Sequence, residues 1–203
     1  MVGCRSAYHR DVVTDHLTPA GVLFFWFGEG DAYGKRHKRW FDKNPAFDDE
    51  IRARFLPLYE RLAVAPRAWL ERAADCLARI VVLDQFPRNM FRGAPRAFAA
   101  DALARAAARH ALEARYDRAM QPVERMFCYL PLEHSESLAD QLLACELTEP
   151  LAAFAETADA HEYALLHRDV IRRFGRFPHR NAILGRASTP EEIEFLKQPR
   201  SSF

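Results

Sequence analysis

The chain has 203 residues, of which 49% are hydrophobic and 28% charged, which is enough apolar material for a packed core and argues against a disordered protein. The formal net charge is only +1, which excludes the strong basic field typical of proteins that bind nucleic acid or anionic membranes. The four cysteines lie far apart without a CxxC pair, and no run of about 18 apolar residues is present, so we expect a cytoplasmic protein without a membrane span.

Helices are predicted along the whole chain, because Ala, Leu, Arg and Glu dominate and period-two alternation is nearly absent. Residues 1–17 have no apolar signal segment, so we expect a flexible leader or an upstream extension of the domain. A single all-α domain is expected over 18–203. In that domain, Thr18 is predicted to cap a short aromatic helix that ends at Gly28, and a long connection follows. Later helices are predicted at about 48–64, 66–85, 95–114, 121–130, 137–157, 160–174 and 190–197.

Start and stop signals are clearest for the last two of these helices. Gly175 follows the 160–174 helix, as a C-terminal stop would. Thr189, Pro190 and Glu192 have the spacing of a capping box at the start of the last helix. Helices of this length with short connections are expected to pack as antiparallel hairpins.

The first unusual polar residue is Asp84, at the inner end of an apolar stripe on the 66–85 helix. The apolar residues before it step by three and four along one helix face, and Asp84 is the next member of that series. A buried carboxylate must be paired or hydrogen-bonded, and Arg88 and Arg92 are the nearest candidate partners. Pro87 is expected to end the helix, so that Arg88, Asn89 and Arg92 project from a loop.

A second polar segment, residues 176–181, follows the 160–174 helix. It is similar in sequence to residues 84–89, because both contain Phe, Pro, Arg and Asn within six positions. His167, on the helix itself, falls in register with apolar residues and is expected on or beside the core side. The loop beyond the helix carries the polar side chains Arg176, His179, Arg180 and Asn181.

A third polar segment lies at the predicted start of the 137–157 helix. His134 and Glu136 precede that start, and Asp140 lies in its first turn. The free backbone N–H groups of a helix start favour an anion, so we expect this corner to contribute to an anion site.

Complete catalytic and metal-binding motifs are absent from the sequence. Gly34 and Lys35 are not followed by the Ser or Thr of a phosphate-binding loop, and no GxSxG is present. The histidines and carboxylates of the polar segments could in principle hold a metal, but the Glu-x-x-His pairs typical of helical-bundle metal sites are missing. We therefore expect no metal and no cofactor.

Several of these segments resemble the DUF924 family of bacterial proteins. The resemblance covers roughly residue 18 to the C-terminus and rests on the segments 22–28 (VLFFWFG), 83–93 (LDQFPRNMFRG), 129–136 (YLPLEHSE), 174–185 (FGRFPHRNAILG) and 188–192 (STPEE). It implies an all-α, tetratricopeptide-like fold, with antiparallel helix hairpins in a right-handed superhelical array. It implies no activity, because the family is one of unknown function. Glu133 departs from the apolar residue expected there and places another carboxylate beside His134.

Three interpretations of the polar segments stay open. The polar side chains could form an internal network that locks helix hairpins together. They could instead line a pocket that binds an anionic small molecule or an acidic peptide on a helical-repeat scaffold, which leaves room for a protein partner. The third interpretation is a metal-independent hydrolase or lyase. His134 or His179 would be its base, oriented by Glu136 or Asp140, and Arg88 or Arg180 would stabilise negative charge.

Overall fold

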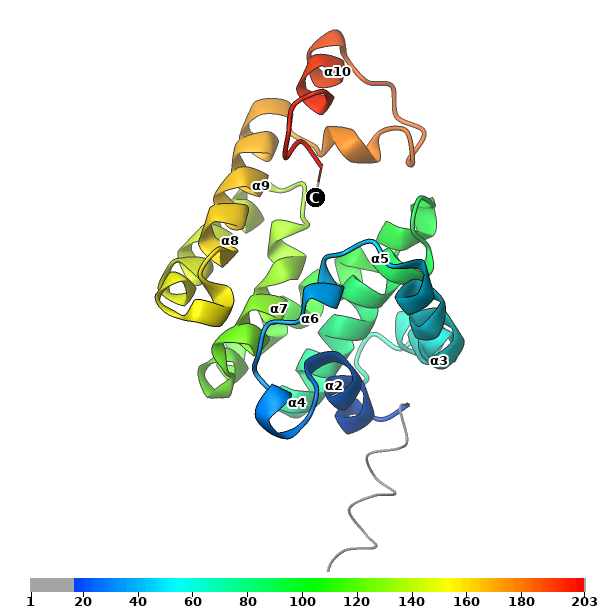
Figure 1. Ribbon diagram of the computed structural model, residues 1–203, viewed down its shortest axis with the longest axis vertical. Coiled ribbons are helices and arrows are strands. Elements are labelled where there is room, and N and C mark those ends of the chain that lie inside the picture. The colour runs from blue at the N-terminus through cyan, green and yellow to red at the C-terminus, as the bar shows by residue number, and fades with distance from the viewer. Residues whose placement is uncertain (1–16, 203) are drawn as a thin grey trace, which may run out of the picture.

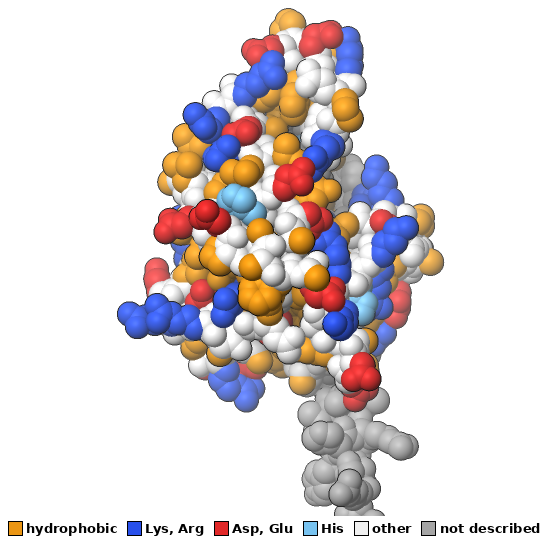
Figure 2. Space-filling view, turned by 60° about the vertical axis from the view of Figure 1, so that its left-hand side comes forward, with side chains coloured by type: hydrophobic (Ala, Val, Ile, Leu, Met, Phe, Trp, Pro, Cys, Tyr) orange, Lys and Arg blue, Asp and Glu red, His pale blue; other side chains and the backbone are white. Residues whose placement is uncertain are grey.

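The computed structural model describes residues 17–202, and every regular element within them is helical, so the expected all-α class is confirmed (Figure 1). Residues 1–16, most of the predicted leader, lie outside the described residues, as does Phe203. No helix in the described range is long and apolar enough to cross a membrane. Side chains of both charges are interspersed over the face drawn in Figure 2, in keeping with the small net charge.

The first two helices begin with side-chain caps. Helix α2 (Pro19–Phe27) starts where Thr18 Oγ1 accepts the N–H three residues on at 3.2 Å, as predicted. It ends at Gly28, whose φ of 83° lies in the left-handed region that glycine tolerates. Helix α3 (Pro45–Ala63) begins before the predicted start at 48, because Asn44 is the residue that caps it.

The predicted 66–85 helix is wrong at both ends. Residues 66–72 form turns, and the φ of 63° at Trp69 is incompatible with a helix there. Helix α4 (Ala73–Ile80) continues into a π-helical turn, η3 (Val81–Gln85), and then into α5 (Phe86–Met90). Pro87 therefore lies inside the helical segment instead of ending it, because it occupies the first turn of α5, where a missing N–H is tolerated.

Short 3-10 segments shorten two of the later predicted helices. The segment that starts at Pro95 is first 3-10 and becomes α-helical only at Asp101. The 137–157 helix ends at Thr148, because Pro150 lacks the N–H that would continue it. The 121–130 helix, by contrast, runs three residues further. The elements here are η4 (Pro95–Phe98), α6 (Asp101–Glu113), η5 (Tyr116–Ala119), α7 (Pro122–Glu133), α8 (Leu138–Thr148), η6 (Glu149–Ala153) and η7 (Ala155–Thr157).

The C-terminal elements follow the sequence signals closely. Helix α9 (Ala160–Phe174) ends at Gly175, whose φ of 70° is left-handed. After the 3-10 segment η8 (Pro178–Arg180), helix α10 (Pro190–Leu196) begins with a capping box. Thr189 Oγ1 accepts the N–H three residues on at 3.2 Å, and the carboxylate of that residue accepts the Thr189 N–H at 2.8 Å. The predicted helix and its capping box are confirmed.

Apolar side chains form one large core and one small one. The small core is separate and belongs to the C-terminal part of the chain, which forms the top of the molecule in Figure 1. The largest buried rings of the main core are Trp26, Phe27, Phe55, Phe86 and Phe127. The buried members of the small core are Val170, Ile171 and Phe177. A site lying between these two cores can therefore draw side chains from both.

Candidate functional site

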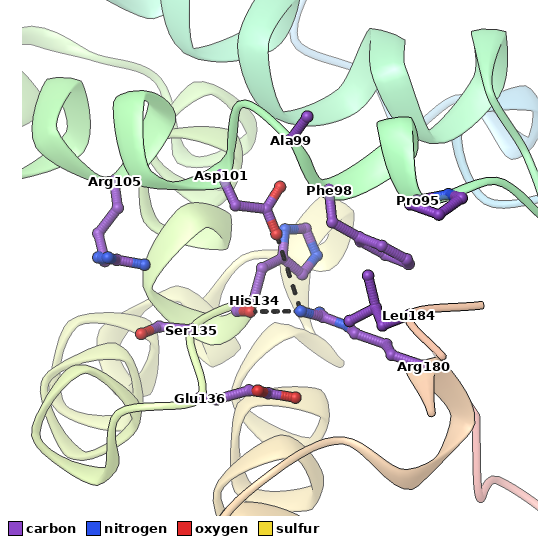
Figure 3. Close-up of a pocket in the computed structure, with 10 residues that line it drawn as sticks. All are labelled: Pro95, Phe98, Ala99, Asp101, Arg105, His134, Ser135, Glu136, Arg180 and Leu184. Carbon is purple, nitrogen blue, oxygen red and sulfur yellow. Dashed lines mark hydrogen bonds and ion pairs between the residues drawn. The ribbon is translucent and has the colours of Figure 1, made fainter. Parts of the chain in front are cut away.

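A cavity of about 350 Å³ lies where the start of α6, the end of α7 and the segment after η8 meet (Figure 3). Its lining has a polar part and an apolar wall that is partly exposed. The apolar wall consists of Pro95, Phe98, Ala99 and Leu184. The polar lining consists of Asp101, Arg105, His134, Ser135, Glu136 and Arg180.

Asp84 lies directly behind this lining and is fully buried. Its carboxylate accepts hydrogen bonds from His134 Nδ1 at 2.8 Å and from Gln85 Nε2 at 2.6 Å, and Arg88 Nη1 lies 3.4 Å away. Burial by itself would raise the pKa of the Asp84 carboxyl, but Arg88 and His134 together hold that pKa well below its ordinary value. Asp84 is therefore an anion in the folded protein.

A chain of charged groups connects Asp84 to the C-terminal segment. Arg88 donates from both terminal nitrogens to the two oxygens of Asp101, each at 3.0 Å. Arg180 Nη1 donates to the His134 carbonyl at 3.0 Å and lies 3.7 Å from Asp101 (Figure 3). Burial and the nearby Arg88 lower the pKa of Arg180 to about 10, so its side chain stays cationic at neutral pH. These contacts hold α5, α6, α7 and η8 around one point.

His134 is oriented by its contact with Asp84, so the expectation that Glu136 or Asp140 orients it is wrong; both of those carboxylates bind arginines instead. An ionised carboxylate can only accept a hydrogen bond, so Nδ1 of His134 carries the proton in this pair. Burial, followed by the charge of Arg88, lowers the pKa of His134, which favours the neutral ring. Nε2 of that ring then carries a lone pair, and it has no hydrogen-bond partner among residues 17–202. The arrangement can accept a proton from a molecule in the cavity.

Neutral polar groups surround this pair on the side of the small core. Burial and the charge of Asp84 raise the pKa of Glu133 to about 8, and the side chain is only 1% exposed. Burial and the nearby His134 lower the pKa of His167 to about 3, and its Nδ1 lies 2.8 Å from the Tyr163 carbonyl. Burial and Arg180 lower the pKa of His179 to about 4. All three side chains are therefore uncharged at neutral pH.

The two remaining acids near the cavity are already paired. Glu136 binds Arg186 through both carboxylate oxygens, at 2.8 and 2.9 Å, and accepts the Phe177 N–H at 2.8 Å. Asp140 accepts from Ser135 Oγ at 2.6 Å and pairs with Arg109 and Arg105. Ser135 Oγ also accepts the backbone N–H of Ser137 at 3.2 Å. The expected anion site at this helix start is thus filled in part by side chains of the protein itself.

Asn89 and Arg92 lie at a different place from the cavity. Both donate to Asp48 on α3, Asn89 at 2.7 Å and Arg92 at 2.7 and 2.8 Å. The expectation that Arg92 pairs with Asp84 is therefore wrong. The physical reason is that the helix continues through Pro87, which turns Arg88 toward Asp84 and the following polar residues toward α3.

Arg176 and Asn181 are also turned away from the cavity lining. Arg176 donates to Glu192 at 2.6 and 2.8 Å, and Asn181 Nδ2 lies 3.2 Å from the same carboxylate. They fix the start of α10. Of the predicted site residues, the structure brings together Asp84, Arg88, His134, Glu136, Asp140, His167, His179 and Arg180.

Several residues at the cavity carry little signal in the sequence. Asp101 looks like an ordinary acid in the first turn of a helix, and Arg105 lies one turn further along it. Phe98 falls at the start of the predicted 95–114 helix but lies in a 3-10 segment, and Leu184 lies outside every predicted helix. Glu133, by contrast, was already visible in the sequence as an unexpected carboxylate beside His134, and the structure buries it there. Among the described residues, no three His, Cys, Asp or Glu side chains are grouped so that they could hold a metal ion.

The chain is similar to proteins whose function is unknown. The chain is similar to a solved structure of a protein of unknown function, ATU0120 from Agrobacterium tumefaciens, with 40% sequence identity and a TM-score of 0.77. The match covers 89% of this chain and 97% of that one. A comparison with curated proteins finds no match. The model of the bacterial proteins of unknown function called DUF924 matches residues 22–200, and the chain therefore belongs to the DUF924 family.

Proposed function

We propose that the cavity binds a small anionic molecule. The observation that carries this proposal is the state of Arg180, which is 6% exposed and points into the cavity (Figure 3). Only Nη1 of its guanidinium is engaged, while Nε and Nη2 have no hydrogen-bond partner among residues 17–202. A buried donor without a partner costs about 1–3 kcal/mol, which an anion at this edge would recover.

The pairing of the neighbouring acids supports the same proposal. Both oxygens of Asp101 are taken by Arg88, and both oxygens of Glu136 are taken by Arg186. The polar lining therefore has donors left over and few free acceptors. A ligand that supplies acceptors and negative charge complements such a lining, whereas a cation does not.

The scaffold part of the proposal is a tetratricopeptide-like right-handed array of antiparallel helix hairpins. Its support is that consecutive helices pack on one another, α7 on α8 and α8 on α9. A consistent crossing sense of successive helix pairs in a crystal structure would agree with it, and an alternating sense would contradict it. The cytoplasmic location, the acidic peptide or protein partner, and the lack of nucleic-acid binding stay predictions.

Thermal unfolding of the full chain against a panel of carboxylates, phosphate and sulfate tests the anion proposal. A ligand at 100 times its dissociation constant stabilises the fold by roughly 2.7 kcal/mol, and each kcal/mol raises the melting temperature by about 2–4 °C for a chain of this size. We expect the shift to disappear in Arg180→Gln and to persist in Arg96→Gln, which removes an exposed arginine paired with Glu60. If no anion shifts the wild type, the cavity is not an anion site and the polar network only stabilises the fold.

A second candidate function is supported by the 2.8 Å contact between Asp84 and His134 Nδ1. A buried carboxylate that fixes the tautomer of a histidine facing a cavity is the arrangement of an oriented general base. In that case the protein is a metal-independent hydrolase or lyase that acts on the bound anion. Anions that bind would be incubated with the protein and followed by NMR. His134→Gln should keep binding and lose turnover, and the absence of any turnover in the wild type would refute the enzyme.

A further inference from the structure

The lining of the cavity points to a more specific class of ligand than an anion. We infer that the cavity takes a monocarboxylate attached to an apolar body. This inference rests on the proposed anion binding, and it concerns the number of charges, the shape of the charged group and the chemistry of the remainder of the ligand.

The number of charges follows from the ionic groups around the cavity. Five cations and four anions meet around the cavity. The cations are Arg88, Arg105, Arg109, Arg180 and Arg186, and the anions are Asp84, Asp101, Glu136 and Asp140. With His134 neutral, the formal sum is +1, which one negative charge on a ligand would neutralise. A single negative charge at the free edge of Arg180 gains attraction, whereas a second one would meet Asp101 and Glu136 on the same lining.

The shape of the charged group follows from the way the Arg180 guanidinium is held. Its central carbon lies 4.8 Å from the centroid of the Phe98 ring and 4.3 Å from that of Phe177. Both rings pack against the guanidinium, and its Nη1 already binds the His134 carbonyl, so the Nε–Nη2 edge is the one without a protein partner among residues 17–202. A planar carboxylate forms two parallel hydrogen bonds in the plane of a guanidinium, which matches the remaining Nε–Nη2 edge.

The apolar body follows from the outer wall. Pro95, Phe98 and Leu184 lie together on one side of Arg180, opposite Arg105, Ser135 and Glu136 (Figure 3). Leu184 is 36% exposed, so its apolar surface is still available for contact. This wall offers no side-chain donor or acceptor, and it begins at the arginine that would hold the carboxylate. The carboxylate and an apolar group of one small molecule can therefore bind side by side.

Calorimetric titration of the full chain with four probes tests this inference. Phenylacetate is expected to bind, acetate to bind at least about tenfold more weakly, and phosphate and 2-phenylethanol not to bind measurably. The ratio follows from burial, because each buried CH₂ strengthens binding by roughly fourfold. Leu184→Ser should weaken phenylacetate binding by roughly the same factor and leave acetate unchanged. Ile193→Ser is the matched control, since that side chain is 49% exposed on α10 and does not line the cavity.

The outcomes separate this inference from the proposal beneath it. Binding of phosphate without phenylacetate would overturn the monocarboxylate and leave the anion site standing. Equal binding of acetate and phenylacetate, with Leu184→Ser like the wild type, would overturn the apolar body. Binding of 2-phenylethanol as tight as that of phenylacetate would mean that the charge contributes nothing, and binding of none of the four would remove the anion site as well.

Discussion

Replacing Glu133 with Gln should change how the stability of the protein depends on pH. Glu133 is 1% exposed, its Oε1 has no hydrogen-bond partner in the described range, and its Oε2 lies 3.8 Å from His167 Nδ1. Burial, aided by the charge of Asp84, raises its pKa from the ordinary 4.5 to about 8. Glutamine has the shape of the protonated side chain and cannot ionise, so Glu133→Gln removes this one titration from the folded state.

The sign and size follow from proton linkage. Between pH 4.5 and 8 the folded state keeps the Glu133 proton that the unfolded chain has lost, so stability falls as pH rises. The slope is about 1.4 kcal/mol per pH unit, which amounts to roughly 3.5 kcal/mol between pH 5 and pH 8. The wild type should lose that much stability relative to Glu133→Gln over this interval.

Urea unfolding followed by circular dichroism at pH 5, 6, 7 and 8 measures the difference. Subtracting one protein from the other cancels the titrations they share, including those of His167 and His179. Glu146→Gln, a substitution at an exposed position on α8, controls for the loss of one carboxyl group. A difference in unfolding free energy that stays constant from pH 5 to pH 8 would show that Glu133 is ionised in the fold, and the electrostatic description of the site would then be wrong.

Three further substitutions test other parts of the structure. His167→Gln should reduce the loss of stability on acidification. The pKa of His167 falls from 6.5 to about 3 on folding, so the wild type loses stability as pH drops below 6.5. The unfolding free energy measured as a function of acidic pH tests this. Arg92→Ala should lower that free energy by about 1–3 kcal/mol by taking two hydrogen bonds from the buried Asp48, and a loss of anion binding in the same variant would contradict the separation of the two clusters. Thr189→Ala should cost about 1 kcal/mol and lower the melting temperature by about 2–4 °C, whereas no change would mean that the cap of α10 contributes nothing.

The sequence predicts which polar side chains are buried better than it predicts which partners those side chains face. Asp84 could be placed at the inner end of an apolar stripe because helical periodicity relates each residue to those three and four positions earlier. The orientation of the Asn89 and Arg92 side chains could not be predicted, because it depends on whether the helix ends at Pro87 or continues through it. The capping box at Thr189 was predictable, since all of its atoms belong to neighbouring residues.

Site residues that meet only through tertiary packing could not be predicted from the sequence. Asp101 joins Arg88 and Arg180, which are 13 and 79 positions away from it in the chain, so no local pattern indicates its role. Leu184 is part of the cavity wall only because the C-terminal segment folds back toward α6. The polar segments themselves were visible in sequence, but the separation of Arg176 and Asn181 from the cavity depended on Glu192, eleven residues or more beyond them.

The π-helical turn η3 makes this stretch intolerant of changes in length. An α-helix advances about 100° per residue, so deletion of one residue within Val81–Gln85 would rotate everything after it by about that angle relative to α4. Asp84 faces His134 and Asn89 faces Asp48, and these partners lie on separate helices that cannot both follow the rotation. An insertion or deletion here would therefore break at least one of these two contacts, whereas a substitution elsewhere in the turn would leave both partners in register.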